Sequence, residues 1–205
     1  MSRVFLLSPA HAGGERARML VRPEASFALA LALRSDEGAP LGEVFSFLSG
    51  LYFRGKRAYA RAFAQPPAGV PGALVITPNR GLFPVDTPVT ARDLLAFGSV
   101  DIDADDSRYR RPLQRDATWL REHAGPDCEV VLLGSIATGK YVSVLSSVLG
   151  AQLRFPPAFV GRGDMSRGGL MLRCARAGQE LDYVPLDGAL RRGSRPPKLE
   201  RPRRE

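Results

Sequence analysis

The chain has 205 residues, of which 44% are hydrophobic and 24% are charged, so it is long enough and apolar enough for one sizeable domain with its own core. No apolar run approaches the roughly 20 residues that a membrane-spanning helix needs. The apolar start at residues 4–7 is also too short for the core of a signal peptide. We therefore expect a cytoplasmic protein with no membrane partner.

The formal net charge of +8 is concentrated at the carboxyl terminus. Residues 191–205 contain seven basic and two acidic side chains, so this segment carries +5 and the preceding 190 residues carry +3. A Pro- and Arg-rich segment of this kind buries too little apolar surface to fold alone. We expect a single α/β domain over residues 1–190 and a disordered basic tail over residues 191–205. The tail either adds electrostatic affinity for nucleic acid or has no specific role.

Cysteine and histidine are scarce. Cys128 and Cys174 provide neither a disulfide framework nor a metal cluster, and the chain has only two histidines. We expect two reduced thiols, no metal site and no cofactor.

Three short aliphatic runs each end in a polar turn that glycine or proline marks. They are residues 4–7, 74–76 and 130–133. Helical patterns lie between these runs, over residues 15–33 with a break near Pro23, over 53–63, over 91–97, and over 108–123 with a cap near Asp106 or Ser107. Alternating strands and helices predict an α/β domain in which helices flank a mainly parallel central sheet.

The last part of the domain shows a different pattern. Strand-like residues 170–174 and 181–185 flank Ala177 and Gly178. Two such runs around a small turn predict a C-terminal β-hairpin.

Polar side chains follow each of the three aliphatic runs. In parallel sheets, ligands bind at the carboxyl ends of the strands. We therefore expect these side chains to lie in one cleft, where they would contact phosphate or nucleic acid: Ser8, His11, Asn79, Arg80, Ser135, Thr138 and Lys140.

The turn after residues 130–133 matches half of a nucleotide-binding motif. Gly134, Gly139 and Lys140 fit the spacing G-x-x-x-x-G-K of a phosphate-binding loop. Tyr141 stands where a nucleotide-hydrolysing loop has the Ser or Thr that holds Mg²⁺, which argues against an ATPase. A phosphate or nucleic-acid contact and a tight structural turn both remain open for this segment.

Residues 161–169 combine Arg162, Asp164, Ser166 and Arg167 with four glycines. Glycines allow a close approach of the backbone to a ligand, and arginines bind phosphates and base edges. We interpret this segment as a ligand or nucleic-acid contact, with a flexible hairpin loop as the alternative.

Residues 52–61 mix aromatic side chains with the cations Arg54, Lys56 and Arg57. Nucleic-acid surfaces use the same mixture, because cations meet phosphates and aromatic rings stack on unpaired bases. An ordinary amphipathic helix with Phe53 and its apolar neighbours turned inward is the alternative.

Two candidates for chemistry follow the first strand. His11 is either a general acid or base or a hydrogen-bonding loop residue. Ser8 lacks the G-x-S-x-G elbow of an α/β hydrolase, so we do not expect a serine hydrolase.

Four short motifs occur in a fixed order along residues 4–167. They are Leu6-Leu7-Ser8-Pro9-Ala10, residues 80–86, residues 130–133 with Tyr141 after the turn, and Arg162-Gly163 with Met165-Ser166-Arg167. In these motifs the chain resembles the YaaA family, bacterial proteins linked to peroxide stress and DNA binding. It departs from that family at His11, where the family has lysine. The chain is also similar to nucleoside-handling domains related to archaeosine synthesis and to uracil-DNA-glycosylase-like α/β folds.

The resemblance implies a nucleic-acid-binding protein, with DNA rather than RNA as partner, in a stress or damage response. The alternative is a DNA-glycosylase-like hydrolase that acts on modified or damaged bases. In that enzyme His11 or Asp164 would transfer protons, Asn79 would bind the base edge, and Lys140 or Arg167 would hold phosphate. A nucleotide-binding regulator is a third interpretation.

Overall fold

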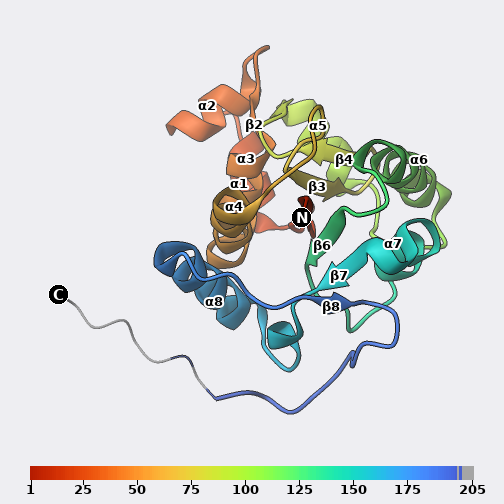
Figure 1. The fold of residues 1–205 in the computed structure, drawn as a ribbon. Helices are drawn as coiled ribbons and strands as arrows, with labels where there is room; N and C mark the ends of the chain where they lie inside the picture. Colours follow the sequence, from red (N-terminus) through yellow and green to blue (C-terminus); the bar gives the residue numbers. More distant parts are fainter. Residues whose placement is uncertain (198, 200–205) are drawn as a thin grey trace.

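The computed structural model describes residues 1–197 and 199. Four parallel strands form the centre of its main sheet, in the order β3 (Ala73–Thr77), β1 (Arg3–Leu7), β6 (Glu129–Leu133) and β7 (Leu153–Phe155). Helices cover both faces of this sheet (Figure 1), which explains why the strands are nearly continuous apolar runs. The predicted α/β class with a mainly parallel sheet is confirmed.

Two antiparallel strands complete the six-stranded sheet. β4 (Gly81–Pro84) pairs with β3, and β8 (Val184–Pro185) pairs with β7. A separate two-stranded ladder joins β2 (Ala39–Pro40) to β5 (Pro88–Val89).

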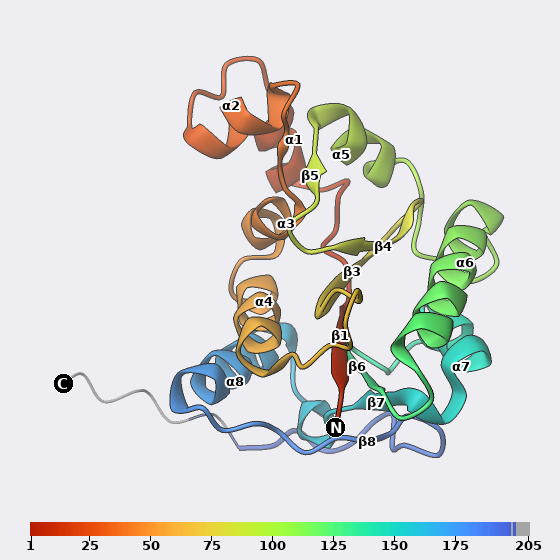
Figure 2. The same cartoon turned by 45° about the horizontal axis from the view of Figure 1, so that its top comes forward.

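The helices form layers on either side of the sheet. On one side lie α3 (Leu41–Ser49), α4 (Leu51–Phe63) and α8 (Asp164–Ala177), and on the other lie α6 (Ser107–Ala124) and α7 (Val142–Leu149) (Figures 1 and 2). The layers bury one continuous core, in which Phe5, Tyr59 and Tyr109 are among the largest fully buried side chains.

Three shorter helices gather at the end of the molecule that carries β2 and β5 (Figure 2). They are α1 (Glu15–Val21), α2 (Ala28–Arg34) and α5 (Ala91–Gly98). The predicted break near Pro23 separates α1 from α2. The predicted cap of α6 is also confirmed, because the Asp106 side chain accepts a hydrogen bond from the Arg108 amide.

The predicted C-terminal β-hairpin is wrong. Residues 164–177 form helix α8, and only Val184–Pro185 are a strand, which pairs with β7. Gly178 is the left-handed residue that ends the helix, with a φ of 62°, and the amides of Gly178 and Gln179 both donate to the Cys174 carbonyl. The glycine that suggested a hairpin turn is therefore a helix stop signal.

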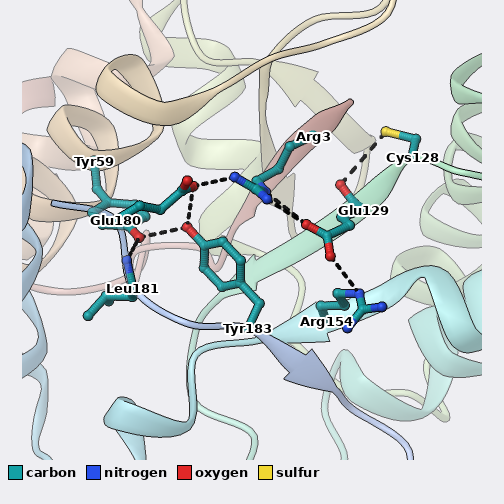
Figure 3. A network of polar contacts seen from close by, with 8 residues as sticks. All are labelled: Arg3, Tyr59, Cys128, Glu129, Arg154, Glu180, Leu181 and Tyr183. Atoms are coloured by element: carbon teal, nitrogen blue, oxygen red, sulfur yellow. Dashed lines mark hydrogen bonds and ion pairs between the residues drawn. The ribbon is translucent and has the colours of Figure 1, made fainter. Parts of the chain in front are cut away.

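A polar network fixes the segment after α8 against the amino edge of the sheet (Figure 3). Arg3 Nη2 lies 2.7 Å from Glu129 Oε2 and Arg3 Nη1 lies 2.5 Å from Glu180 Oε1. Arg154 Nε lies 3.0 Å from the other oxygen of Glu129. The Tyr59 and Tyr183 hydroxyls are 2.6 Å apart. The network joins β1, β6, β7, α4 and the segment that leads into β8.

The described part of the predicted tail, residues 191–197 and 199, contains neither a helix nor a strand. Residues 198 and 200–205 of that tail lie outside the described residues. Across the described chain, no helix combines the length and the apolarity needed to cross a membrane. Within the same residues, no three His, Cys, Asp or Glu side chains are grouped so that they could hold a metal ion.

Candidate functional site

A cavity of about 570 Å³ opens where β1 and β6 end, and we call it the carboxyl-edge cavity. Seven of the side chains singled out in the sequence line it: Ser8, His11, Ser135, Thr138, Lys140, Asp164 and Arg167. Ser8 directly follows β1, and His11 lies in the same turn. Ser135, Thr138 and Lys140 follow β6, and Asp164 and Arg167 lie in the first turn of α8. The structure thus brings these side chains together, and the roles expected of them stay predictions.

Two other expected members lie elsewhere. Asn79 donates from Nδ2 to the Ala96 carbonyl oxygen at 2.8 Å, and Arg80 Nη2 lies 2.6 Å from Asp93 Oδ1. Both contacts are made with α5 or its first turn, because the β3–β4 turn packs against that helix. Neither Asn79 nor Arg80 lines the carboxyl-edge cavity.

Arg162 lies in the turn before α8 and Ser166 in the first turn of α8, and both are outside the lining of the cavity. Arg162 Nη1 donates to Ser166 Oγ at 3.2 Å, and Arg162 Nε donates to the Ala158 carbonyl oxygen at 3.0 Å. These contacts hold the turn that leads into α8. They occupy only part of the guanidinium, which is half-buried.

Lys56 is fully buried directly behind Ser8. Its Nζ lies 2.6 Å from Ser8 Oγ and 2.9 Å from the Ser8 carbonyl oxygen. The ammonium group also lies 3.8 Å from the centroid of the Tyr52 ring. Lys56 is therefore not one of the surface cations that the basic composition of residues 52–61 suggests.

Burial decides the protonation of Lys56. Loss of solvation lowers the pKa of this lysine to about 7, against the opposing effect of the Asp164 carboxylate and with a smaller further lowering by Arg167. The face of the Tyr52 ring favours the charged form. Near neutral pH the amine therefore exists in both its charged and neutral forms.

Tyr141 and Gly134 enclose the other side of Ser8. Tyr141 is buried, and its hydroxyl donates to the Ser135 carbonyl oxygen at 2.8 Å. Burial raises the pKa of Tyr141, while a contact with the Ser8 hydroxyl opposes this shift. A Cβ on Gly134 would lie 2.8 Å from Ser8 Cβ and 3.0 Å from Tyr141 Oη, so only glycine leaves room for both side chains.

Tyr52 closes the cavity from α4. Its hydroxyl is buried, and among the described residues no group completes a hydrogen bond of normal geometry with it. Burial raises its pKa, and the nearby Arg167 guanidinium partly offsets that effect. Arg167 is held in turn, because its Nε donates to the Phe159 carbonyl oxygen at 3.2 Å and its Nη1 lies 3.3 Å from Asp164 Oδ1.

Helices α4 and α8 cross at two glycines. A Cβ on Gly55 would lie 2.6 Å from the Gly168 carbonyl oxygen, and a Cβ on Gly168 would lie 2.7 Å from the Leu51 carbonyl oxygen. Lys56 and Arg167 are the neighbours of these glycines in sequence. The close crossing therefore places both cations beside Ser8.

A second basic site lies on the outer surface of the same two helices. A groove of about 820 Å³ is lined by Arg54, Arg57, Arg61 and Arg176, and we call it the arginine groove. Arg57 Nη2 is 3.5 Å from Glu43 Oε1, which also lines the groove. Arg54, Arg61 and Arg176 are exposed, and no ion pair with them is found within residues 1–197 and 199.

Composition alone did not distinguish Lys56 from its basic neighbours, but helical spacing could have done so. Tyr52, Lys56, Tyr59 and Phe63 follow one another at steps of four, three and four, which places them on one face of a helix. Arg54, Arg57 and Arg61 fall on another face at steps of three and four. The pairing of Lys56 with Ser8 has no such local signal, because 48 residues separate them.

None of the family models, curated proteins or solved structures with which the chain was compared matches it. The fold and the site by themselves define an α/β protein with a charged cavity at the carboxyl edge of its sheet and an arginine-lined groove on its surface.

Proposed function

We propose that this protein binds nucleic acid, DNA rather than RNA, through the arginine groove. The observation that supports this proposal is the convergence of four arginines from α4 and α8 on one groove, with Glu43 as the acidic side chain in its lining. Arginine binds phosphate oxygens through two parallel hydrogen bonds, so a row of exposed guanidinium groups suits a phosphate backbone.

The geometry of α4 gives the row its direction. Arg54, Arg57 and Arg61 are spaced three and four residues apart, so they follow one face over about two turns, or roughly 10 Å. Each DNA strand carries one phosphate charge per about 3.4 Å of helix axis, so a face of this length can meet more than one phosphate. Arg176 on α8 provides a fourth cation across the groove.

A salt titration tests the proposal. The intact protein should shift a labelled DNA duplex or single strand in a mobility assay at 50 mM salt, and affinity should fall steeply by 200 mM. Arg54→Glu with Arg61→Glu should weaken binding at least about tenfold and lower the slope of log K against log salt by about 2.

A control variant makes the same two charge reversals on other helices. Arg92→Glu with Arg111→Glu alters two exposed arginines of α5 and α6. If both double variants weaken binding equally, the binding is a net-charge effect and the groove is not the interface. An intact protein that binds neither DNA nor RNA at 50 mM salt would overturn the proposal.

The motifs shared with the YaaA family support a role for this binding in a stress or damage response. That role predicts that deletion of the gene lowers survival after peroxide exposure, and that the intact gene restores it. The Arg54→Glu, Arg61→Glu variant should fail to restore survival.

A second candidate, an enzyme that acts on a nucleobase or its glycosidic bond, is favoured by the carboxyl-edge cavity. The cavity brings His11 and Asp164 together with the cations Lys140 and Arg167. Asn79, the expected base-binding residue, lies outside it. Release of a modified base from DNA, abolished in His11→Ala or Asp164→Ala, would support this enzyme, and full activity in both variants would remove these two roles.

A further inference from the structure

We infer that Ser8 and Lys56 form a nucleophile–base pair, with which the carboxyl-edge cavity hydrolyses carboxylic esters. This inference goes beyond nucleic-acid binding and uses neither His11 nor the arginine groove. It also differs from the expectation from sequence, in which Ser8 was set aside because the α/β-hydrolase elbow is absent. A lysine can replace histidine as the base that activates a serine.

The geometry of the pair meets the first requirement of such a mechanism. Lys56 Nζ lies 2.6 Å from Ser8 Oγ, within the reach of direct proton transfer. A second contact of 2.9 Å to the Ser8 carbonyl oxygen fixes the direction of the amine. A neutral amine can donate to this carbonyl oxygen while its lone pair accepts the Ser8 hydroxyl proton.

Ser8 and Lys56 differ in their access to the cavity. Ser8 is 5% exposed and lines the carboxyl-edge cavity, whereas Lys56 is 0% exposed and does not line it. A carbonyl carbon in the cavity can therefore be attacked by Ser8 Oγ but not by Lys56 Nζ, which lies behind Oγ and exchanges protons with the groups beside it. This arrangement suits a lysine that acts as base and not as nucleophile.

The reaction can be written with its atoms in balance. As Ser8 Oγ attacks the ester carbonyl carbon, its proton moves to the neutral Lys56 amine. The tetrahedral intermediate collapses, the alkoxide leaves with the proton from Lys56, and an acyl-Ser8 remains. Water then attacks this acyl group and gives one proton to Lys56, and collapse returns that proton to Ser8 Oγ. The sum is ester plus water to carboxylic acid plus alcohol.

Two further groups of the cavity, Arg167 and Tyr141, lie beside the Ser8–Lys56 pair. Arg167 is held by Phe159 and Asp164 and lines the same cavity, so it provides a fixed cation for the negative charge that develops on the carbonyl oxygen. Tyr141 Oη is engaged by the Ser135 carbonyl oxygen and borders Ser8 from the opposite side.

The protonation of Lys56 should make the reactivity of Ser8 depend on pH. Asp164 and Arg167 act on Lys56 from α8, and Tyr52 covers it from α4. Tyr141, in the turn after β6, contacts the Ser8 hydroxyl that Lys56 faces. Burial lowers the pKa of Lys56 to about 7, while Asp164 opposes this shift and Arg167 adds to it. Reactivity of Ser8 should therefore rise as the pH increases through about 7.

The experiment uses the full chain, an alkyl fluorophosphonate probe and p-nitrophenyl acetate. The probe loses fluoride to Ser8 Oγ and leaves a stable phosphonyl adduct, which intact-protein mass spectrometry counts and peptide mapping locates. We expect one adduct, on Ser8, and ester hydrolysis that the probe abolishes. Ser8→Ala should lose both signals.

Lys56→Met tests the base, and Ser147→Ala serves as the matched serine control. Lys56→Met should lower the labelling rate about 100-fold or more. Ser147 is exposed on α7, away from the cavity lining, so its variant should label at the normal rate. Thermal unfolding of each variant shows whether it is folded.

Three results would overturn the inference: no adduct on Ser8, an unchanged labelling rate in folded Lys56→Met, or, if that variant does not fold, a labelling rate of the intact protein that is flat between pH 6 and 9. The outcome is separable from nucleic-acid binding. Ser8→Ala should still bind DNA, and the Arg54→Glu, Arg61→Glu variant should still react with the probe.

Discussion

Lys56 is fully buried, and within the described residues its amine has two hydrogen bonds, both to Ser8. A buried lysine opposes folding whenever it is charged, because its ammonium group loses the solvation that it has in the unfolded chain. Retention of a cation behind Ser8 therefore costs stability at the pH values where the amine is protonated.

This cost predicts a pH dependence of stability. The pKa of Lys56 falls from 10.5 in the unfolded chain to about 7 in the fold, so between these values the unfolded state binds more protons. The free energy of unfolding should then rise with pH, by up to about 1.4 kcal/mol per pH unit from this residue. Urea unfolding of the protein and of Lys56→Met at pH 7, 8 and 9 isolates this contribution. The variant should give the flatter dependence, and parallel curves would show that Lys56 does not titrate there.

Gly134 leaves the space that Ser8 and Tyr141 need at the site. Its substitution by alanine would place a methyl group 2.8 Å from Ser8 Cβ and 3.0 Å from Tyr141 Oη. We expect Gly134→Ala to destabilise the fold by about 1–3 kcal/mol, as overpacking does, and to slow labelling of Ser8. Thermal unfolding and probe labelling measure the two effects. Normal values for both would mean that the turn after β6 relaxes without moving Ser8.

At the scale of elements, the crossing of α4 and α8 builds the site. Glycine weakens a helix relative to alanine, by about 1 kcal/mol for each residue. Gly55 and Gly168 are nonetheless well placed, because each lies against the backbone of the other helix. Close contact at these two positions brings Lys56 and Arg167 to the end of β1.

This crossing predicts that Gly55→Ala and Gly168→Ala destabilise the protein, although alanine favours helices. The added methyl groups would lie 2.6 Å and 2.7 Å from backbone oxygens, which cannot turn aside as a side chain can. We expect a loss of about 1–3 kcal/mol for each variant in urea unfolding. Gly139→Ala, at a position with open space, is the control and should be nearly neutral. A gain in stability for either helix variant would refute the close crossing.

The same helices show how far the sequence could predict the structure. The strand ends at Ser8 and Ser135 were predictable, because aliphatic runs followed by polar turns are local patterns. Residues 170–174 were misassigned because Leu170, Leu172 and Cys174 alternate as in a strand. The packing of Gly168 on α4 and the pairing of Lys56 with Ser8 depend on residues far apart in the chain. No local pattern contains that information.

At the scale of the whole molecule, β1 joins two polar sites at opposite edges of the sheet. Arg3 begins the strand within the amino-edge network, and Ser8 follows its end at the carboxyl-edge cavity. Five steps of about 3.3 Å separate them by roughly 16 Å. The two sites share no side chain, so one can stabilise the fold while the other carries the chemistry.

This separation gives the last prediction. Glu129 neutralises both Arg3 and Arg154 with a side chain that is 12% exposed, whereas Glu180 is 30% exposed and neutralises Arg3 alone. Glu129→Gln should lower the free energy of unfolding by about 3 kcal/mol, because two arginines lose their buried counterion. Glu180→Gln should lower it by about 1 kcal/mol. Urea unfolding measures both losses.

At temperatures where the variants remain folded, the labelling rate of Ser8 should be unchanged. The substitutions alter charges and contacts only at the start of β1, and Ser8 follows the other end of that strand. Slower labelling in Glu129→Gln would instead couple the two edges through β1 and make the amino-edge network part of the functional site.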